Sequence, residues 1–220
     1  MLIAGIIGSE GKVQTASLIN SILASIGKKV SVIDSASLLE LDGRRIRAYI
    51  SELEKNNIDL LLLKTGISDI DKFLSSEIHF DIAIYTDKAE DIDESDKNRY
   101  SGKMEKAFSL MADKGVAIVN VDDNDLIRLL QGMKHRFITY GFNSKASITT
   151  SSIGDSVFKD GFICCLQRSI STHNGRVIEP QEYKLKLDAN EFDSHNVLAA
   201  ASFAIINDID LNNMSEILTM

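Results

Sequence analysis

Two kinds of apolar spacing alternate along the first two thirds of the chain. Short apolar runs, such as 2–7 and 58–63, are followed by segments in which apolar residues return every three or four positions, such as 15–26. The run 58–63 does not alternate with polar residues, which is typical of a central strand buried on both faces. The segment 15–26 is followed by Gly27, a frequent residue just after a helix. Strands that alternate with helices predict parallel βαβ units.

After residue 146 the strand-like segments follow one another without helices between them. His173, Asn174 and Gly175 form a turn between two such runs, and Asn-Gly is a strong signal for a β-hairpin. A helix returns over 194–206, where alanines permit close packing. We therefore predict a single α/β domain, residues 1–220, with a three-layer P-loop fold. It comprises a mainly parallel sheet with its helices at 1–145, a smaller antiparallel sheet within 146–190, and returning helices at 191–220.

The predicted elements follow from these spacings and from the turn residues between them. Strands are expected at 2–7, 29–33, 58–63, 79–86, 115–120, 136–140, 147–151, 161–171 and 177–187. Helices are expected at 15–26, 44–57, 104–114, 125–131 and 194–206, with a short final helix from Met214. We find neither an internal repeat nor a proline-rich linker that would mark a second domain.

Composition argues against two classes of partner and indicates a compartment. The 220 residues are 44% hydrophobic, enough for a sizeable core, and carry a formal net charge of −8. A nucleic-acid-binding surface calls for clustered Lys and Arg, so no nucleic-acid partner is expected. The apolar runs are far shorter than the roughly 20 residues that cross a bilayer, and no basic region precedes the first of them. We expect a cytoplasmic protein without membrane contact, and the adjacent Cys164 and Cys165 suit a reducing compartment.

The loop after the first strand carries the strongest candidate chemistry. A P-loop uses glycines, backbone amides and a lysine to hold phosphate oxygens. The residues in those places here are Gly8, Ser9, Gly11 and Lys12. Val13 follows where a P-loop has a Ser or Thr that binds magnesium, and Glu10 places a carboxylate inside the loop, where it should repel phosphate. The alternative is a glycine turn between strand and helix with a solvated lysine.

Carboxylates also stand at the ends of predicted strands and in the loops after them. Asp34 would hold a ribose hydroxyl, as in dinucleotide folds, or cap a helix or turn. Asp122 and Asp123 follow a strand end, where α/β folds place ligands, and would bind a ligand or cap the next helix. The acidic stretch 87–96 is expected to be a solvated loop, and the alternative is a cation held by its carboxylates. The histidines, at 79, 135, 173 and 195, have no metal-ligand spacing, so no metal site is predicted.

Five separated segments share their order and spacing with the motifs of one known family. Segment 5–15 is similar to G-x-T-G-T-x-G-K-T-T, and segment 100–105 to Y-H-G-x-M-E. Segments 117–123 and 138–141 are similar to the strand ends A-I-I-N-x-D-D and I-T-Y-G, and segment 194–197 to an x-H-N helix start. These motifs belong to the Mur ligases, closest to the muramyl tripeptide synthetases, and to their folylpolyglutamate synthetase relatives. The chain resembles the central ATP-binding domain of that family along nearly its whole length.

The resemblance implies ATP or ADP as the ligand. Lys12 and the loop amides would lie near the phosphates. The residues implied near the base and ribose are Asn120, Asp122, His195 and Asn196. The resemblance also implies a relation to the cytoplasmic ligases of peptidoglycan and cell-wall synthesis, which join a carboxylate to an amine and release ADP. Because it covers only the central domain, partner domains would come from a longer chain or another subunit.

Four positions depart from the family pattern where that pattern supports metal-assisted catalysis. Lys64 replaces a magnesium-binding glutamate, Ile92 replaces a metal-binding histidine, and Met111 replaces a lysine that becomes carbamylated. Val13 replaces the loop threonine. Formation of an acyl phosphate needs divalent ions that offset the charge of the triphosphate. The sequence therefore predicts at best weak nucleotide binding without dependence on Mg²⁺, and no catalytic residue is assigned.

Three functions stay open at this point. The first is a nucleotide-binding domain with degenerate catalytic positions. The second is an active ADP-forming carboxylate-amine ligase that partner domains complete. The third is a non-enzymatic scaffold or regulatory homologue that uses the fold as a protein interaction surface. The lost metal positions speak against the second function, and the retained Lys12 and Asn196 speak against the third.

Overall fold

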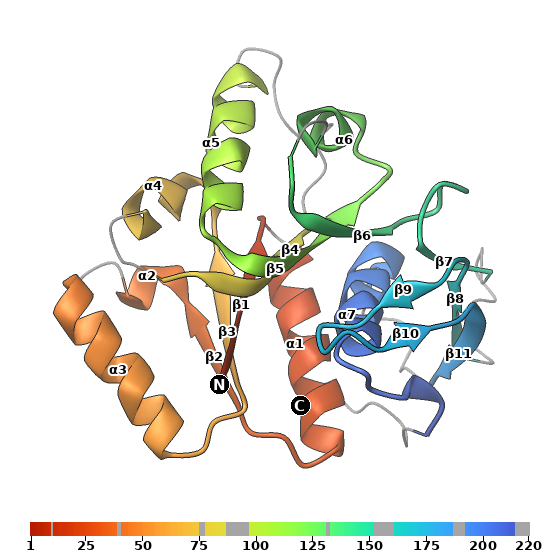
Figure 1. Cartoon of the computed structure of the whole chain (residues 1–220), viewed down its shortest axis with the longest axis horizontal. Coiled ribbons are helices and arrows are strands. Elements are labelled where there is room, and N and C mark those ends of the chain that lie inside the picture. Colours follow the sequence, from red (N-terminus) through yellow and green to blue (C-terminus); the bar gives the residue numbers. More distant parts are fainter. Residues whose placement is uncertain are drawn as a thin grey trace.

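A computed structural model describes residues 1–9, 11–38, 41–74, 78–86, 97–130, 133–151, 161–186 and 192–213 (Figure 1). Its strands are β1 (Leu2–Ile7), β2 (Val30–Asp34), β3 (Leu60–Thr65), β4 (Phe80–Tyr85), β5 (Met111–Asn120), β6 (Arg136–Tyr140), β7 (Ile148–Thr150), β8 (Phe162–Leu166), β9 (Ile170–Ser171), β10 (Val177–Ile178) and β11 (Gln181–Leu185). Its α-helices are α1 (Gly11–Ser25), α2 (Ser35–Leu38), α3 (Gly43–Lys55), α4 (Ile70–Phe73), α5 (Lys97–Ser109), α6 (Asn124–Leu130) and α7 (Ser194–Ile206), and its 3₁₀ turns are η1 (Ile67–Asp69) and η3 (Leu211–Asn213). The predicted helix from Met214 lies outside the described residues.

Most strands belong to one sheet with the order β11-β8-β7-β6-β5-β4-β1-β3-β2. Between β6 and β2 in this order, all neighbouring strands are parallel. Strand β7 continues the sheet through a parallel bridge between Tyr140 and Ile148. The predicted hairpin is confirmed, since β9 and β10 pair antiparallel around Gly175, which has a φ of +84°. The α/β fold with a mainly parallel sheet and a small antiparallel sheet is thus confirmed. The structure differs in placing β7, β8 and β11 at the edge of the main sheet, with β9 and β10 alone forming the small one.

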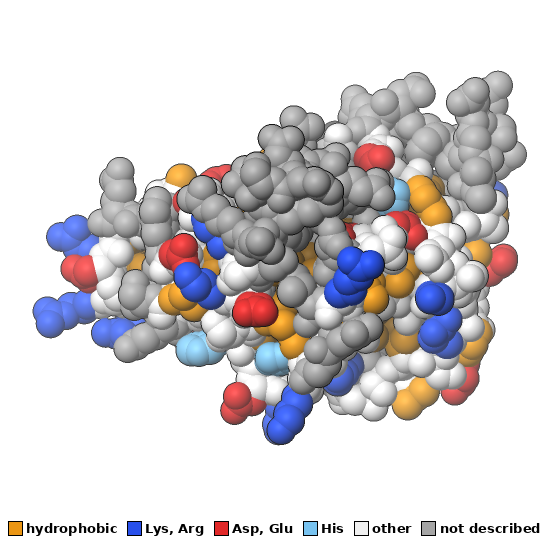
Figure 2. All heavy atoms as spheres, turned by 90° about the horizontal axis from the view of Figure 1, so that it is seen from above, with side chains coloured by type: hydrophobic (Ala, Val, Ile, Leu, Met, Phe, Trp, Pro, Cys, Tyr) orange, Lys and Arg blue, Asp and Glu red, His pale blue; other side chains and the backbone are white. Residues whose placement is uncertain are grey.

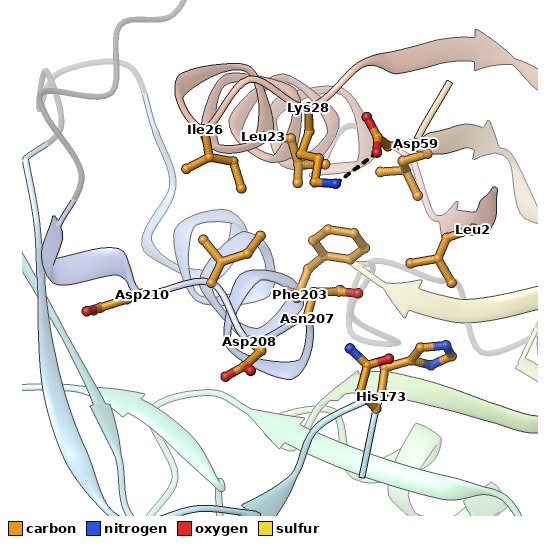
Figure 3. A pocket seen from close by; sticks show the side chains of 13 residues that line it. Leu2, Leu23, Ile26, Lys28, Asp59, His173, Phe203, Asn207, Asp208 and Asp210 are labelled. Atoms are coloured by element: carbon orange, nitrogen blue, oxygen red, sulfur yellow. Dashed lines mark hydrogen bonds and ion pairs between the residues drawn. The ribbon is translucent and has the colours of Figure 1, made fainter. Parts of the chain in front are cut away.

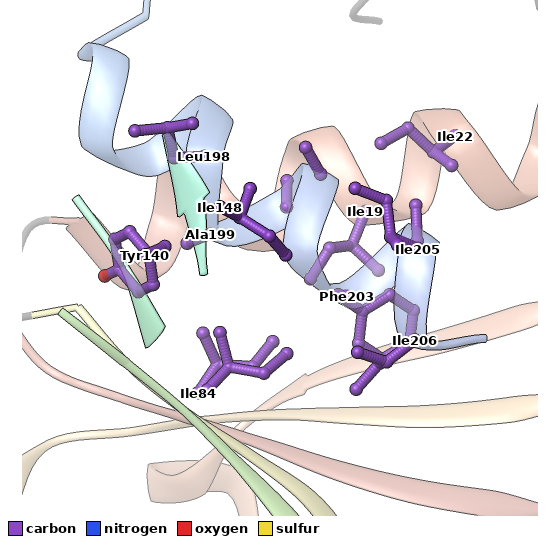
Figure 4. Packing of buried hydrophobic residues seen from close by; sticks show 14 of the residues in the cluster. Ile19, Ile22, Ile84, Tyr140, Ile148, Leu198, Ala199, Phe203, Ile205 and Ile206 are labelled. Carbon is purple, nitrogen blue, oxygen red and sulfur yellow. The ribbon is translucent and has the colours of Figure 1, made fainter. Parts of the chain in front are cut away.

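Helices cover both faces of the main sheet and make the predicted three layers. On one face α1 and α7 pack against each other and against the strands, with Ile19, Ile22 and Phe203 in the shared core (Figure 4). The helices from α2 to α6 lie on the other face, where Phe73 and Phe108 belong to a second core. None of the helices within the described ranges is long and apolar enough to cross a membrane.

Strand β3 is buried on both faces, as its uninterrupted apolar run predicts. Leu62 belongs to the core on the side of α1 and α7, and Leu63 belongs to the core on the opposite side. The prediction that this strand is central is wrong, because β3 lies second from the edge, between β1 and β2. Burial on both faces requires only helices above and below the strand, so it does not reveal how far the strand lies from the edge.

Helix α5 begins earlier and ends earlier than predicted, and residues 111–114 are strand rather than helix. The helix ends where Ser109 Oγ donates to the Lys106 carbonyl oxygen at 2.6 Å. The Phe80 amide then donates to the Leu110 carbonyl oxygen at 2.7 Å, and Met111 pairs with Phe80 at the start of β5. Met111 therefore joins β5 by pairing with β4, although its apolar side chain continues the helical spacing of α5.

Candidate functional site

The predicted site residues meet at the carboxyl edge of the parallel strands. Gly8 follows β1, Asn120 ends β5 and Asp122 follows it, while Lys12 and His195 lie in the first turns of α1 and α7. Neighbouring parallel strands end at the same edge of a sheet, so these residues converge although they are far apart in sequence. Figure 2 views the molecule from this side, and acidic and basic side chains are interspersed on the face that it shows.

The loop between β1 and α1 packs closely against the first turn of α7. The Gly8 amide donates to the Thr65 carbonyl oxygen at 3.0 Å, and Lys12 Nζ donates to the Gly8 carbonyl oxygen at 3.0 Å. A Cβ on Gly11 would lie 2.8 Å from Asn196 Oδ1, so the Asn196 side chain or α1 would have to shift to accommodate it. Gly11 thus lets the Asn196 side chain of α7 approach α1 closely, and the ammonium of Lys12 lies over the loop.

Two residues of α1 hold the side-chain amide of Asn196. Asn196 Nδ2 donates to Gln14 Oε1 at 2.7 Å, and its Oδ1 accepts from Thr15 Oγ1 at 3.4 Å. Gln14 Oε1 also accepts from the Asp193 amide at 3.3 Å. Asp193 caps α7, since its Oδ1 accepts from the His195 amide at 2.9 Å. The start of α7 is thus tied to the start of α1.

Asp122 organises the other part of the site. Its Oδ2 accepts from the Phe142 amide at 2.7 Å, and its Oδ1 accepts from the Asn143 amide at 2.9 Å. His195 Nε2 lies 3.0 Å from Asp122 Oδ2 and carries the hydrogen of this contact, because a carboxylate only accepts. The Phe142 ring contacts the imidazole in a tilted arrangement, with 4.3 Å between ring centroids and 55° between ring planes. Gly141, with a φ of +147°, lets the chain turn around the carboxylate, since a Cβ there would lie 2.6 Å from Asp122 Oδ2.

Asn120 supplies a buried hydrogen-bond donor beside Asp122. The side chain is fully buried, and its Oδ1 accepts from the Asp122 amide at 3.0 Å. Its Nδ2 has no hydrogen-bond partner within the described part of the chain. Buried donors without a partner are rare in folded proteins because they cost free energy. An acceptor atom of a ligand at this position would satisfy the donor.

Two other carboxylates act as caps, which supports the structural alternative for each. Asp123 Oδ1 accepts from the Leu126 amide at 2.9 Å and caps α6. Asp34 Oδ1 accepts from the Ala36 amide at 3.2 Å, so it closes the turn after β2. Of the three carboxylates, Asp122 contacts the site residue His195, whereas Asp123 and Asp34 cap local backbone.

The residues at two of the positions where the family pattern has magnesium ligands do not fit a divalent cation. Val13 is 53% exposed and offers a hydrocarbon side chain where an oxygen ligand is needed. Lys64 Nζ lies 3.8 Å from Asp34 Oδ2, so an ammonium occupies the place of a carboxylate and pairs with the neighbouring strand end. Among the residues that the structure describes, no three His, Cys, Asp or Glu side chains gather closely enough to hold a metal ion.

Four other residues singled out in the sequence take no part in the contacts described above: Ser9, Glu10, Ile92 and Met111. Ser9 is exposed in the loop, and Met111 is buried as the first residue of β5. Glu10 and Ile92 lie outside the described residues, so the repulsion of phosphate by Glu10 stays a prediction. Nothing in the described contacts gives Met111 a chemical role.

The electrostatics of the α7 cap favour an ionised carboxylate. The His195 side chain, with Nδ1 3.6 Å from Asp193 Oδ1, holds the pKa of Asp193 below its usual value. Partial burial of Asp193 opposes this shift, and the backbone amide of His195 supports it. His195 thus lies between two carboxylates, Asp122 and Asp193.

A pocket of about 550 Å³ lies at the opposite end of the sheet (Figure 3). It is bordered by the start of β1 and the ends of α1 and α7, with Leu2, Leu23 and Phe203 among its apolar residues. Lys28 Nζ donates to Asp59 Oδ1 at 2.9 Å beside it. No predicted nucleotide-binding residue lines this pocket, so it is separate from the candidate site.

Sequence reasoning missed three residues of the candidate site. Gln14 contacts Asn196 across 182 residues, and no local pattern predicts such a contact. Phe142 reaches His195 only because of the turn at Gly141. Asp193 was detectable, since Asp directly before an apolar helix is a frequent N-cap.

Comparison with known proteins assigns the chain to a family. The family model described as Mur ligase middle domain matches residues 6–204. The chain belongs to this family. The resemblance predicted from the five sequence segments is thereby confirmed.

Curated relatives of this Mur ligase middle domain are longer ligases. The UDP-N-acetylmuramoyl-L-alanyl-D-glutamate--2,6-diaminopimelate ligase of Caldanaerobacter subterraneus subsp. tengcongensis is 23% identical over 233 residues, which cover 100% of this chain and 45% of the relative. The UDP-N-acetylmuramate--L-alanine ligase of Aquifex aeolicus is 27% identical over 150 residues, which cover 66% of this chain and 30% of the relative. The chain thus spans less than half the length of these relatives.

Solved structures share the fold. A UDP-N-acetylmuramoyl-L-alanyl-D-glutamate--2,6-diaminopimelate ligase matches with a TM-score of 0.67 and 16% identity over 96% of this chain and 44% of its own. The MurF ligase of Thermotoga maritima in complex with ADP matches with a TM-score of 0.60 and 14% identity over 97% of this chain and 48% of its own. Escherichia coli FolC in complex with DHPP and ADP matches with a TM-score of 0.62 and 15% identity over 96% of this chain and 54% of its own. At such identities the similarity shows the fold alone.

Proposed function

We propose that this Mur ligase middle domain, residues 1–220 acting as one unit, binds ATP or ADP at the carboxyl edge of its sheet. We further propose that it does not carry out metal-dependent ligation by itself. The observation that carries the proposal is the contact between the Lys12 loop and the start of α7, where Gly11 lies closely against the Asn196 side chain. Two solved structures of the same fold are complexes with ADP, which supports a nucleotide as the ligand.

The phosphates of the nucleotide would lie at the loop between β1 and α1. Lys12 would exchange the carbonyl oxygen of Gly8 for a phosphate oxygen, and the backbone of Gly8, Ser9 and Gly11 would approach closely because no large side chain intervenes. The N-terminus of α1 adds a partial positive charge of roughly one half. The loop therefore offers both a full and a partial positive charge to an anion.

The base and ribose would lie toward β5, β6 and α7. Asn120 Nδ2 is a buried donor that needs an acceptor, and a purine carries acceptor nitrogens at its edge. Phe142 is 49% exposed beside His195 and provides a flat apolar surface. Asp122 fixes His195, and Asn196 completes the set at the start of α7.

Magnesium has no part in this proposal. A divalent ion would supply a Lewis acid that polarises the γ-phosphate while its phosphoryl group passes to a carboxylate and ADP leaves. Val13 offers no oxygen for such an ion, and the ammonium of Lys64 would repel it. The residues at these positions support binding of a nucleotide but not its activation.

The second candidate function is an ADP-forming carboxylate-amine ligase that acts with partner domains. The names of the longer relatives, which are ligases that act on peptidoglycan precursors, favour it. Release of ADP with a pair of candidate acid and amine substrates would support this function over the first. The third candidate, a scaffold or regulatory homologue, predicts that neither ATP nor ADP binds.

Calorimetric titration with ATP and with ADP tests the proposal. The wild-type protein should bind both, and Lys12→Met should weaken both, because the ammonium over the loop is lost while the length of the side chain is nearly kept. Lys55→Met is the matched control, since Lys55 is exposed in the last turn of α3, away from the site. Binding that is equal in Lys12→Met and Lys55→Met would contradict the proposed place of the phosphates.

A further inference from the structure

We propose that Gln14 is a positioning residue that sets the geometry between the phosphate side and the base side of the site. The inference rests on the proposed nucleotide binding and extends it to a residue that contacts neither half of the ligand. Gln14 lies in α1, directly after the residues of the loop, and its side chain reaches across to α7. The carbonyl oxygen of its side chain thus links the two halves of the site, beside the hydrogen bond between Thr15 and Asn196.

Among the described residues, the side-chain contacts of Gln14 use its acceptor oxygen. Gln14 Oε1 accepts from Asn196 Nδ2 at 2.7 Å and from the Asp193 amide at 3.3 Å. The first contact holds a side chain of the site, and the second holds the backbone of the α7 cap. One atom therefore fixes both the side chain and the helix end that carries it.

The orientation of Asn196 follows from this arrangement. Thr15 Oγ1 donates to Asn196 Oδ1 at 3.4 Å, while Gln14 accepts one of the two N–H groups of Nδ2. With the amide held at both ends, its plane is set and the second N–H has a fixed direction. Asn196 is only 7% exposed, so little room is left for it to rotate.

A nucleotide that spans both halves gains affinity when their spacing is already correct. Binding one half of such a ligand places the other half at a high effective concentration at its own subsite, and this gain disappears if the geometry is lost. Removing the Gln14 acceptor should therefore weaken a complete nucleotide more than a ligand that uses the phosphate subsite alone. A purely structural role would weaken both ligands alike.

The test compares the affinities of ATP and tripolyphosphate in the wild type and in three variants. Gln14→Met removes the acceptor at similar size and should weaken ATP by about tenfold, as for a lost positioning hydrogen bond, with tripolyphosphate unchanged. Gln181→Met is the matched control, because Gln181 is exposed at the start of β11. Gln14→Glu keeps the acceptor, so the Asp193 amide should keep its protection from hydrogen exchange in this variant. In Gln14→Met, which lacks the acceptor, the Asp193 amide should lose that protection.

The outcomes separate this inference from the proposed function. Wild-type protein that binds neither ATP nor ADP would overturn the proposed function and, with it, this inference. Wild-type binding with an unchanged ATP affinity in Gln14→Met would overturn the inference alone. Equal weakening of ATP and tripolyphosphate, or unchanged exchange of the Asp193 amide in Gln14→Met, would also overturn it.

Discussion

Replacement of Gly11 by alanine should damage both the fold and the site, because the added methyl group meets α7. A Cβ at this position would lie 2.8 Å from Asn196 Oδ1 and 3.2 Å from Thr86 Cβ. The first distance is too short for a carbon and an oxygen atom, so either α1 or the Asn196 side chain must move. Movement of Asn196 would strain or break its hydrogen bond to Gln14.

The magnitude follows from two destabilising effects and one stabilising effect. Overpacking of a closely packed contact costs about 1–3 kcal/mol, and loss of the Asn196 hydrogen bond adds roughly 0.5–1.5 kcal/mol. Exchange of glycine for alanine in a helix contributes up to about 1 kcal/mol of stabilisation in the other direction. We expect Gly11→Ala to lower the free energy of unfolding by roughly 0.5–4.5 kcal/mol in total.

Gly43→Ala is the matched control, because Gly43 is also the first residue of a helix. A Cβ there would lie 3.7 Å from Arg47 Nη1, an ordinary contact. Urea-induced unfolding followed by circular dichroism measures both variants, and calorimetry measures their affinity for ATP. Gly43→Ala should be as stable as the wild type or slightly more stable, with unchanged affinity. Equal stability and affinity of the two variants would refute the close approach of α7 to the loop.

Two further predictions concern the carboxylates on either side of His195. Asp193 has a folded-state pKa below its unfolded value, so its charge stabilises the fold above about pH 4, and this contribution is lost as the pH falls through the folded-state pKa. Asp193→Asn can still cap α7 but does not titrate. Below about pH 4 its free energy of unfolding, measured with urea, should therefore fall less than that of the wild type. Parallel pH profiles of the two proteins would contradict the role of His195. Asp122→Ala should lower the free energy of unfolding by about 2 kcal/mol, since hydrogen bonds to a charged acceptor are lost, and should weaken ATP binding. Asp113→Ala, at an exposed position of β5, is its control, and equal effects of the two substitutions would count against the site.

Local patterns predicted the elements whose ends carry clear signals. Helix α7 was predicted with its observed bounds because an apolar, alanine-rich run begins after Asp193 and ends before polar residues. The boundary between α5 and β5 was wrong, since Met104, Phe108 and Met111 continue a helical spacing and no glycine or proline separates the two elements. All three residues are buried, the first two from the helix and the last from the strand. Burial alone therefore left the type of element ambiguous.

Contacts between distant segments set the rest of the fold and site. The bridge between Tyr140 and Ile148 attaches the antiparallel strands to the main sheet, and a single bridge of this kind leaves no periodic trace in the sequence. The sequence motifs identified Asp122 and His195 separately, but their contact at 3.0 Å requires β5 and α7 to pack together. The same holds for Gln14, whose role appears only once α1 lies beside α7.

The central claim is a nucleotide site that works without a divalent ion. Titration of the wild-type protein with ATP over a series of magnesium concentrations, with ADP release followed in the presence of candidate acids and amines, tests it most directly. We predict measurable ATP binding whose affinity does not increase with magnesium, and no release of ADP, because Val13 and Lys64 supply no oxygen ligand to the ion. Affinity that rises steeply with magnesium, or turnover with any pair of substrates, would contradict the account and make the active ligase the leading function.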